Sequence, residues 1–165
     1  MTANGVRTEI SPKYSTAQEA EDKIILHAME ILARRVASGP LITNPDTAYS
    51  YLRLWLGGRE TEAFVVLYLN TAHKLISAEI VSEGTLNAAT VFPREILKRV
   101  LSLNAAAVIL AHNHPSGDLH FSPTDIKITK KLQDALQLIE VKTLDHVLVT
   151  AGGSASMQEE GLLPL

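Results

Sequence analysis

Two histidines and an aspartate are the residues of this sequence best suited to chemistry. His112 and His114 close an apolar run, residues 105–110, whose composition predicts a buried strand. Asp125 lies at the start of a helical pattern that continues to Ile139. Side chains at positions i and i+2 of a strand lie on the same face, so the two imidazoles should lie together. The polar loop that follows can bring the carboxylate of Asp125 beside them.

Two imidazoles and one carboxylate form a ligand set that suits zinc. The sequence contains no cysteine, so any metal site must use His, Asp or Glu side chains. Three protein ligands leave a fourth tetrahedral position open, which is typical of a catalytic rather than a structural zinc site. The alternative is a hydrogen-bonded loop without metal, in which Ser122 caps the helix and Asp125 supplies the acid of its first turn. The two roles of Asp125 are compatible.

The order of these residues resembles the JAMM motif of JAB/MPN metallopeptidases. The motif appears as His112-x-His114, ten further residues and Asp125, with Ser122 three residues before the aspartate. Other words resemble the RadC branch of that superfamily: His112-Asn-His-Pro-Ser-Gly-Asp118, Pro93-Arg94-Glu95, Glu83-Gly84-Thr85, Asp145-His146 and Glu160-Gly161-Leu162-Leu163. The resemblance covers about residues 42–163. It implies the cytidine-deaminase-like JAB/MPN fold, an α/β domain of three layers around a mixed sheet.

The resemblance also implies an activity. A zinc metallohydrolase of this kind cleaves a peptide or isopeptide bond with a metal-activated water, and its partner is a peptide or protein substrate. Glu62, in the word Glu-x-Phe, is expected to be the general base, with Glu60 as its main rival. Ser122 is expected to donate a hydrogen bond to the oxyanion, although it could be a helix cap only. Asp145-His146 has no derived catalytic role, and we expect hydrogen bonds behind the site or in the core.

Two other functions remain open at this point. The first is a RadC-like accessory module that binds DNA or a protein partner without catalysis, and the second is a nuclease. Fifteen basic and 18 acidic residues give a net charge of −3, without the basic excess typical of nucleic-acid binding. The helix-hairpin-helix module that longer RadC-like proteins carry upstream is not expected here, because the N-terminal stretch has room for one helix. Weak DNA binding, or none, is therefore expected.

Hydrophobic spacing predicts the elements that position these residues. The predicted strands are 62–69, 74–82, 105–111 and 141–150, and the predicted helices are 15–38, 45–56, 93–104 and 122–139. The order after the first two helices is β-β-α-β-α-β, which favours a three-layer α/β domain with a mixed sheet. We divide the chain into an N-terminal tail with an amphipathic helix, 1–40, and the RadC-like JAB/MPN domain, 41–165.

Three further expectations concern the periphery of the chain. The N-terminal helix is expected to pack on the domain with its apolar stripe, Ile25, Met29, Leu32 and Val36, and a surface for a partner is the alternative. Residues 151–165 are expected to form a mostly exposed tail. No run is long and apolar enough to cross a membrane and no signal-peptide pattern opens the chain, so a cytoplasmic location is expected.

Overall fold

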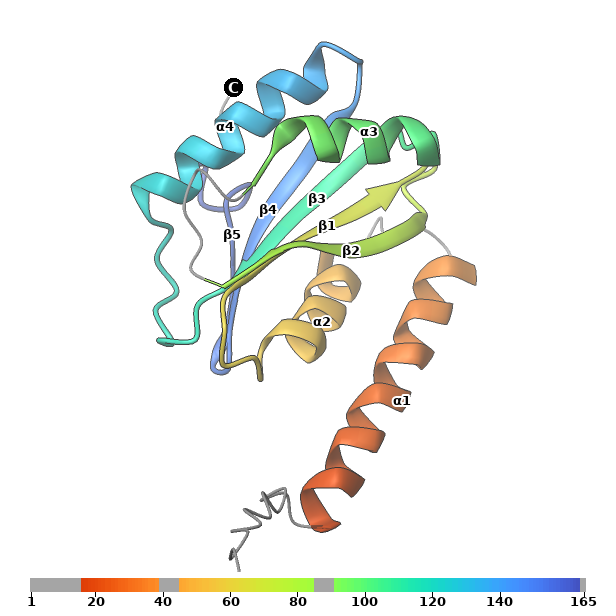
Figure 1. Cartoon of the computed structure of the whole chain (residues 1–165), viewed down its shortest axis with the longest axis vertical. Helices are drawn as coiled ribbons and strands as arrows, with labels where there is room; N and C mark the ends of the chain where they lie inside the picture. Colours follow the sequence, from red (N-terminus) through yellow and green to blue (C-terminus); the bar gives the residue numbers. More distant parts are fainter. Residues whose placement is uncertain (1–15, 39–44, 85–90, 164–165) are drawn as a thin grey trace, which may run out of the picture.

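The computed structural model describes residues 16–38, 45–84 and 91–163 and is built on one mixed sheet. The sheet has five strands in the order β2-β1-β3-β4-β5 (Figure 1). The strands are β1 (Ala63–Leu69), β2 (Leu75–Glu83), β3 (Ala107–Asn113), β4 (Lys142–Thr150) and β5 (Gly153–Ser156). Strands β3 and β4 run parallel, whereas the other neighbouring pairs run antiparallel.

Helices cover both faces of the sheet. Helix α2 (Pro45–Leu56) lies on one face, and helices α3 (Pro93–Leu103) and α4 (Pro123–Gln137) lie on the other (Figure 1). Each face has its own apolar core, one formed with Leu52 and Leu56 of α2 and the other with Ile96 and Leu132 of α3 and α4. The predicted three-layer α/β architecture is confirmed.

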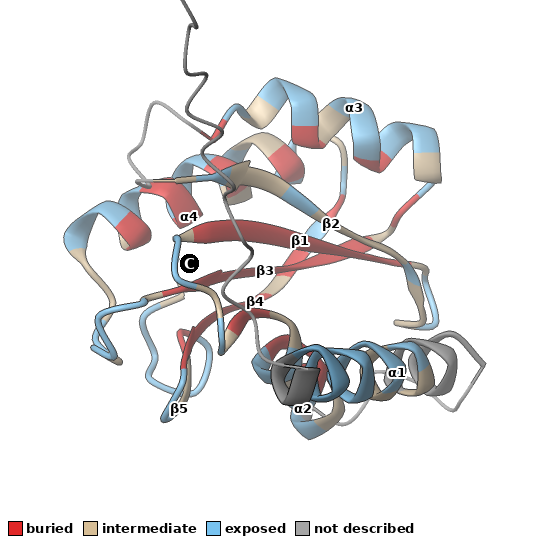
Figure 2. Cartoon of the chain, turned by 60° about the horizontal axis from the view of Figure 1, so that its bottom comes forward, coloured by how far each residue is buried: buried red, intermediate tan, exposed pale blue. Residues whose placement is uncertain are grey.

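The central strands are apolar on both faces because both faces are covered. All residues of β1 and β3 are buried, and the burial colouring of Figure 2 shows these strands as continuous buried ribbons. The predicted start of β3 at residue 105 is two residues early. The N–H of Ala105 bonds to the carbonyl of Val100 at the end of α3, and that of Ala106 already bonds to Leu69 of β1, but regular strand pairing begins at Ala107.

A close backbone approach fixes where α2 ends. The N–H of Gly57 donates to the carbonyl of Arg53 at 2.9 Å, and a Cβ atom on Gly57 would lie 2.6 Å from that oxygen. A larger residue would therefore shift the helix end. This end leads directly into residues 59–62, which enter β1.

The N-terminal helix α1 (Thr16–Ser38) forms as predicted but is less covered than expected. It contacts α2 and β2, yet Ile24 is 69% and Leu26 60% exposed. Figure 2 shows the coloured part of α1 as largely exposed. Of the predicted apolar stripe, Ile25 is 43% exposed and Met29 is half-buried, and the side chains of Leu32 and Val36 lie outside the described residues. The contacts with α2 and β2 agree with the expectation that the helix packs on the domain, although the helix extends away from the sheet (Figure 1).

The C-terminal segment contains a strand that the sequence did not predict. β5 pairs with β4 from Val147↔Ser156 to Thr150↔Gly153, and Met157 after it is fully buried. The expectation of a mostly exposed tail is therefore wrong for residues 153–157. Residues 158–161 are exposed, whereas Leu163 is partly buried and its N–H donates to the carbonyl of Met157. Among the described residues, none of the helices has both the length and the apolar character needed to span a bilayer.

Candidate metal centre

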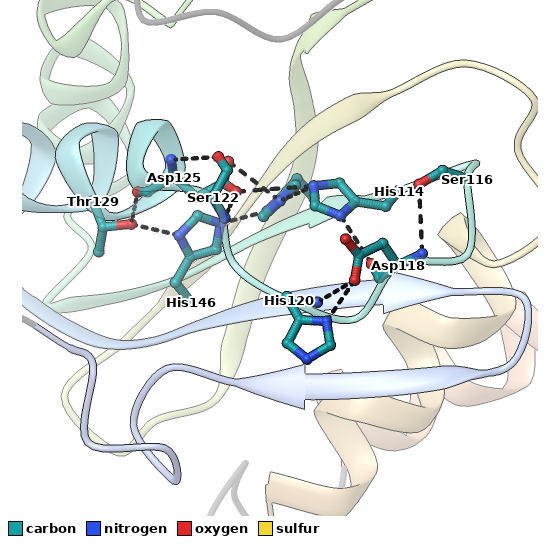
Figure 3. Close-up of polar contacts among 9 residues, drawn as sticks. His114, Ser116, Asp118, His120, Ser122, Asp125, Thr129 and His146 are labelled. Atoms are coloured by element: carbon teal, nitrogen blue, oxygen red, sulfur yellow. Dashed lines mark hydrogen bonds and ion pairs between the residues drawn. The ribbon is translucent and has the colours of Figure 1, made fainter.

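The two histidines and the aspartate converge where β3 ends and α4 begins (Figure 3). The Nε2 atom of His112 lies 3.2 Å from Nε2 of His114 and 3.4 Å from Oδ1 of Asp125. The Nε2 atom of His114 lies 3.9 Å from Oδ2 of Asp125. His112 and Asp125 are buried and His114 is partly buried. Within the described part of the chain, no other group of His, Asp or Glu side chains converges in this way.

The backbone determines which nitrogen of His114 faces this cluster. Its Nδ1 atom lies 2.9 Å from the carbonyl oxygen of Asp118, in the loop that joins β3 to α4. A carbonyl only accepts, so Nδ1 of His114 must be the donor. In the neutral imidazole the Nε2 atom then carries a lone pair, and this lone pair faces His112 and Asp125.

The donor set and its spacing fit a divalent metal ion. Two imidazole nitrogens and a carboxylate are all electron-pair donors, so their convergence is unfavourable unless a cation lies among them. Zn–N bonds of about 2.0–2.1 Å in a tetrahedral site place two ligand nitrogens about 3.3 Å apart. The 3.2 Å between the Nε2 atoms of His112 and His114 matches that edge. This buried His-His-Asp cluster could therefore bind a metal ion.

The start of α4 holds Asp125 rigidly. The Oγ atom of Ser122 accepts from the N–H of Asp125 at 3.2 Å, and Oδ2 of Asp125 accepts from the N–H of Ser122 at 2.7 Å. This reciprocal pair is a capping box, so the predicted N-cap role of Ser122 is confirmed.

Two phenylalanines enclose the histidine rings. Phe64 on β1 stacks on His112 with ring centroids 6.4 Å apart, and its edge meets His146 at 5.4 Å. Phe121 packs against the same two rings at 6.2 and 5.8 Å. Sequence reasoning singled out Phe64 only as part of the Glu-x-Phe motif, and it did not predict that Phe121 faces the site. These rings limit the orientations that His112 can adopt.

The carboxylate predicted to be the base lies where β1 meets the end of β3. Phe64 pairs with His112 in the antiparallel register, and Glu62, two residues before Phe64, is on the same strand face by alternation. The side chain of Asn113, buried and unpredicted, accepts from the N–H of Ala63 at 2.8 Å and donates to the carbonyl of Thr61 at 3.0 Å. Asn113 therefore holds both sides of Glu62 against β3.

Glu60 lies in a different local environment from Glu62. Its backbone is in a bend before β1 and its side chain is exposed, whereas Glu62 is partly buried and directly precedes β1. Both acids border a surface pocket with Pro115 and Ser116, and Glu60 also borders a second pocket that includes His114. Because side chains alternate along a strand and Glu60 lies in a bend, Glu62 is favoured as the residue on the same face as His112. Both acids lie near the loop that joins β3 to α4.

The side chains of the Asp145-His146 motif lie on opposite faces of the sheet. Asp145 accepts from Tyr49 Oη on α2 at 2.8 Å, from Ser156 Oγ at 2.6 Å and from its neighbour's N–H at 2.7 Å, which makes it a core hydrogen-bond centre. His146 lies on the opposite face, fully buried, with Nε2 2.8 Å from Nδ1 of His112. Burial, followed by charge at His112, holds the pKa of His146 well below its ordinary value.

The third histidine of the loop stays outside the cluster. The side chain of His120 is 93% exposed and its Nδ1 lies 2.7 Å from Oδ1 of Asp118. Hydrogen bonding to Asp118 raises the pKa of His120, and the same bond lowers the pKa of Asp118. His120 is therefore a solvent-exposed ion-pair partner on the same loop as His114.

Comparison with known proteins identifies the family. A model of the RadC-like JAB domain matches residues 42–162. A UPF0758 protein of Vibrio cholerae is 46% identical over 158 residues, covering 93% of this chain and 100% of that protein. A second V. cholerae UPF0758 protein is 45% identical over 152 residues, covering 92% and 96%. A UPF0758 protein of Methylibium petroleiphilum is 46% identical over 148 residues, covering 89% and 67%.

These names state no activity for the relatives. The match nevertheless covers most of the chain and includes every residue of the His-His-Asp cluster. The resemblance read from the motif words is confirmed, and the chain belongs to the RadC-like JAB domain family.

Proposed function

We propose that this protein is a zinc-dependent metallohydrolase that cleaves a peptide or isopeptide bond. One observation carries the proposal: three electron-pair donors, His112, His114 and Asp125, converge in one cluster, in which the His112–His114 and His112–Asp125 distances of 3.2 and 3.4 Å fit a tetrahedral metal site. Three protein ligands leave room for a water or substrate atom, which is the arrangement of hydrolytic zinc sites. Peptide and isopeptide bonds share the amide group, so the same chemistry serves both.

The chain's own residues would divide the remaining work. A zinc ion held at this site supplies Lewis acidity and lowers the pKa of a water bound to it. Glu62, on the strand face of Phe64 and His112, would accept the proton of the attacking water and deliver it to the leaving amine. Ser122 already accepts from the helix with its Oγ atom, so its hydroxyl hydrogen remains available to donate to the oxyanion.

We expect about one zinc ion per chain in protein purified without added metal, and a large loss of zinc in His114→Ala. The reason is that His114 supplies one of only three ligands. Elemental analysis of both proteins measures the content. His120→Ala is the matched control, because it removes an exposed histidine from the same loop and should retain zinc. Equal zinc in wild type and His114→Ala would contradict the site.

We expect DNA binding to be weak and sensitive to salt. Four of the six basic side chains of α3 and α4 form ion pairs with carboxylates. The pairs are Arg94–Glu95, Lys98–Glu95, Arg99–Glu79 and Lys130–Asp134. These pairs reduce the positive potential available to phosphates. Titration of a labelled duplex near physiological salt should give a Kd no tighter than the nonspecific range of about 10⁻⁴–10⁻⁶ M. Submicromolar affinity would favour the accessory-module function instead.

A further inference from the structure

A buried hydrogen-bond chain runs behind the metal cluster. From the carbonyl of Asp125 it passes to Thr129 Oγ1 at 2.6 Å, then to Nδ1 of His146 at 2.5 Å, and from Nε2 of His146 to Nδ1 of His112 at 2.8 Å. Figure 3 shows Thr129 and His146 linked on the side of the cluster away from His114. Thr129 and His146 are both fully buried, so no water competes for these bonds.

The direction of each bond follows from the carbonyl at one end. The carbonyl of Asp125 only accepts, so the single hydroxyl hydrogen of Thr129 is directed to it. Thr129 Oγ1 must then accept from Nδ1–H of His146. With its hydrogen on Nδ1, the neutral imidazole of His146 carries a lone pair on Nε2, which accepts from Nδ1–H of His112. The remaining nitrogen of His112, Nε2, therefore presents its lone pair to the cluster.

We propose that His146, oriented by Thr129, is a positioning residue that fixes the tautomer and ring orientation of the metal ligand His112. His146 does for His112 what the carbonyl of Asp118 does for His114. A partner on the far nitrogen is the usual device by which proteins orient a ligating imidazole, and its loss typically weakens metal binding about 10–100-fold. This inference rests on the proposed metal site, but it does not depend on the substrate.

The first experiment compares two replacements of His146. His146→Gln keeps an acceptor and a donor in a side chain of similar reach, whereas His146→Leu keeps an apolar filling and removes both. We expect His146→Leu to bind zinc about 10–100-fold more weakly in competition with a chromophoric chelator, and His146→Gln to recover much of the affinity. The visible spectrum of bound Co²⁺ should change in His146→Leu, because the ring of His112 loses its fixed orientation.

The second experiment uses matched threonines, which guards against a His146→Leu variant that does not fold. Thr129→Val removes the hydroxyl of the chain without changing side-chain shape, and Thr129→Ser keeps it. Thr143→Val is the control, since Thr143 is also buried and its hydroxyl has no hydrogen-bond partner among the described residues. We expect weaker zinc binding and an altered Co²⁺ spectrum in Thr129→Val only.

The possible outcomes separate this inference from the proposed function. Wild-type zinc affinity and an unchanged Co²⁺ spectrum in His146→Leu would overturn the positioning role and leave the metal site standing. Equal affinities for Thr129→Val, Thr129→Ser and Thr143→Val would overturn the part assigned to Thr129. A wild-type protein that binds neither zinc nor Co²⁺ would overturn the inference and the proposed function together.

Discussion

Replacing Glu62 by Gln is expected to leave the metal content unchanged and to reduce hydrolysis about 10²–10⁴-fold. Gln keeps the shape of the side chain but cannot accept the proton of the attacking water. Glu62 is not among the converging metal-binding side chains, so the zinc should stay. Elemental analysis and turnover of a panel of peptide-linked and isopeptide-linked fluorogenic substrates measure the two quantities on the same preparations.

Glu60→Gln is the matched control for this experiment. Glu60 is two residues away, exposed, and in a bend, whereas Glu62 is partly buried and directly precedes β1. We expect near wild-type turnover from Glu60→Gln. An inactive Glu60→Gln beside an active Glu62→Gln would transfer the base to Glu60, and full activity in both variants would refute a mechanism that uses either carboxylate as the base.

Replacing Ser122 by Asp is expected to preserve the helix and abolish turnover. Asp caps a helix as well as Ser, so the bond that Ser122 accepts from the N–H of Asp125 can be kept. A carboxylate cannot donate to the oxyanion, and its negative charge beside the oxyanion would oppose the transition state. Loss of one oxyanion donor typically costs about 10²–10³ in kcat. Thermal unfolding, zinc content and kcat are the three measurements.

Ser122→Ala removes both the helix cap and the proposed oxyanion donor, and the two losses have different expected effects. Loss of the cap alone should lower the free energy of unfolding by about 0.5–2 kcal/mol and leave turnover near wild type. Loss of a catalytic donor should lower kcat strongly with little change in zinc content. Turnover close to wild type in Ser122→Asp would reduce Ser122 to a helix cap and remove it from the catalytic site.

Most of the fold follows from hydrophobic periodicity, and the departures have specific causes. Strands β1 and β3 are buried on both faces of the sheet and are therefore continuously apolar. Such apolar runs are recognisable as strands in the sequence. Strand β5, Gly-Ser-Ala-Ser, has no apolar alternation and exists because β4 offers it an edge. The contacts of α1 with α2 and β2 could not be read from its stripe, because an amphipathic pattern indicates which residues favour burial but not which surface they meet.

The site was predictable where the residues are close in sequence. His112, His114 and Asp125 share one strand-loop-helix segment, and the capping box at Ser122 has a local signature. The contacts of Asn113 with β1 and of His146 with His112 join separate strands, so no local pattern reveals them. Thr129 carried a weak signal, since a residue four positions after Asp125 lies on the same helix face.

The three proposed metal ligands all lie within residues 112–125, whereas Glu62 directly precedes a different strand, β1. This separation has a consequence for local unfolding. The backbone around Glu62, the proposed base, is held at the outer end of β1 by the two side-chain hydrogen bonds of Asn113 and by the N–H of Gly84, which donates to the carbonyl of Glu62 at 2.9 Å. Strand ends open more readily than strand centres. If the proposed function is correct, fraying there would stop hydrolysis without releasing the metal, so hydrogen exchange at Ala63 would report catalytic competence that a metal assay does not detect.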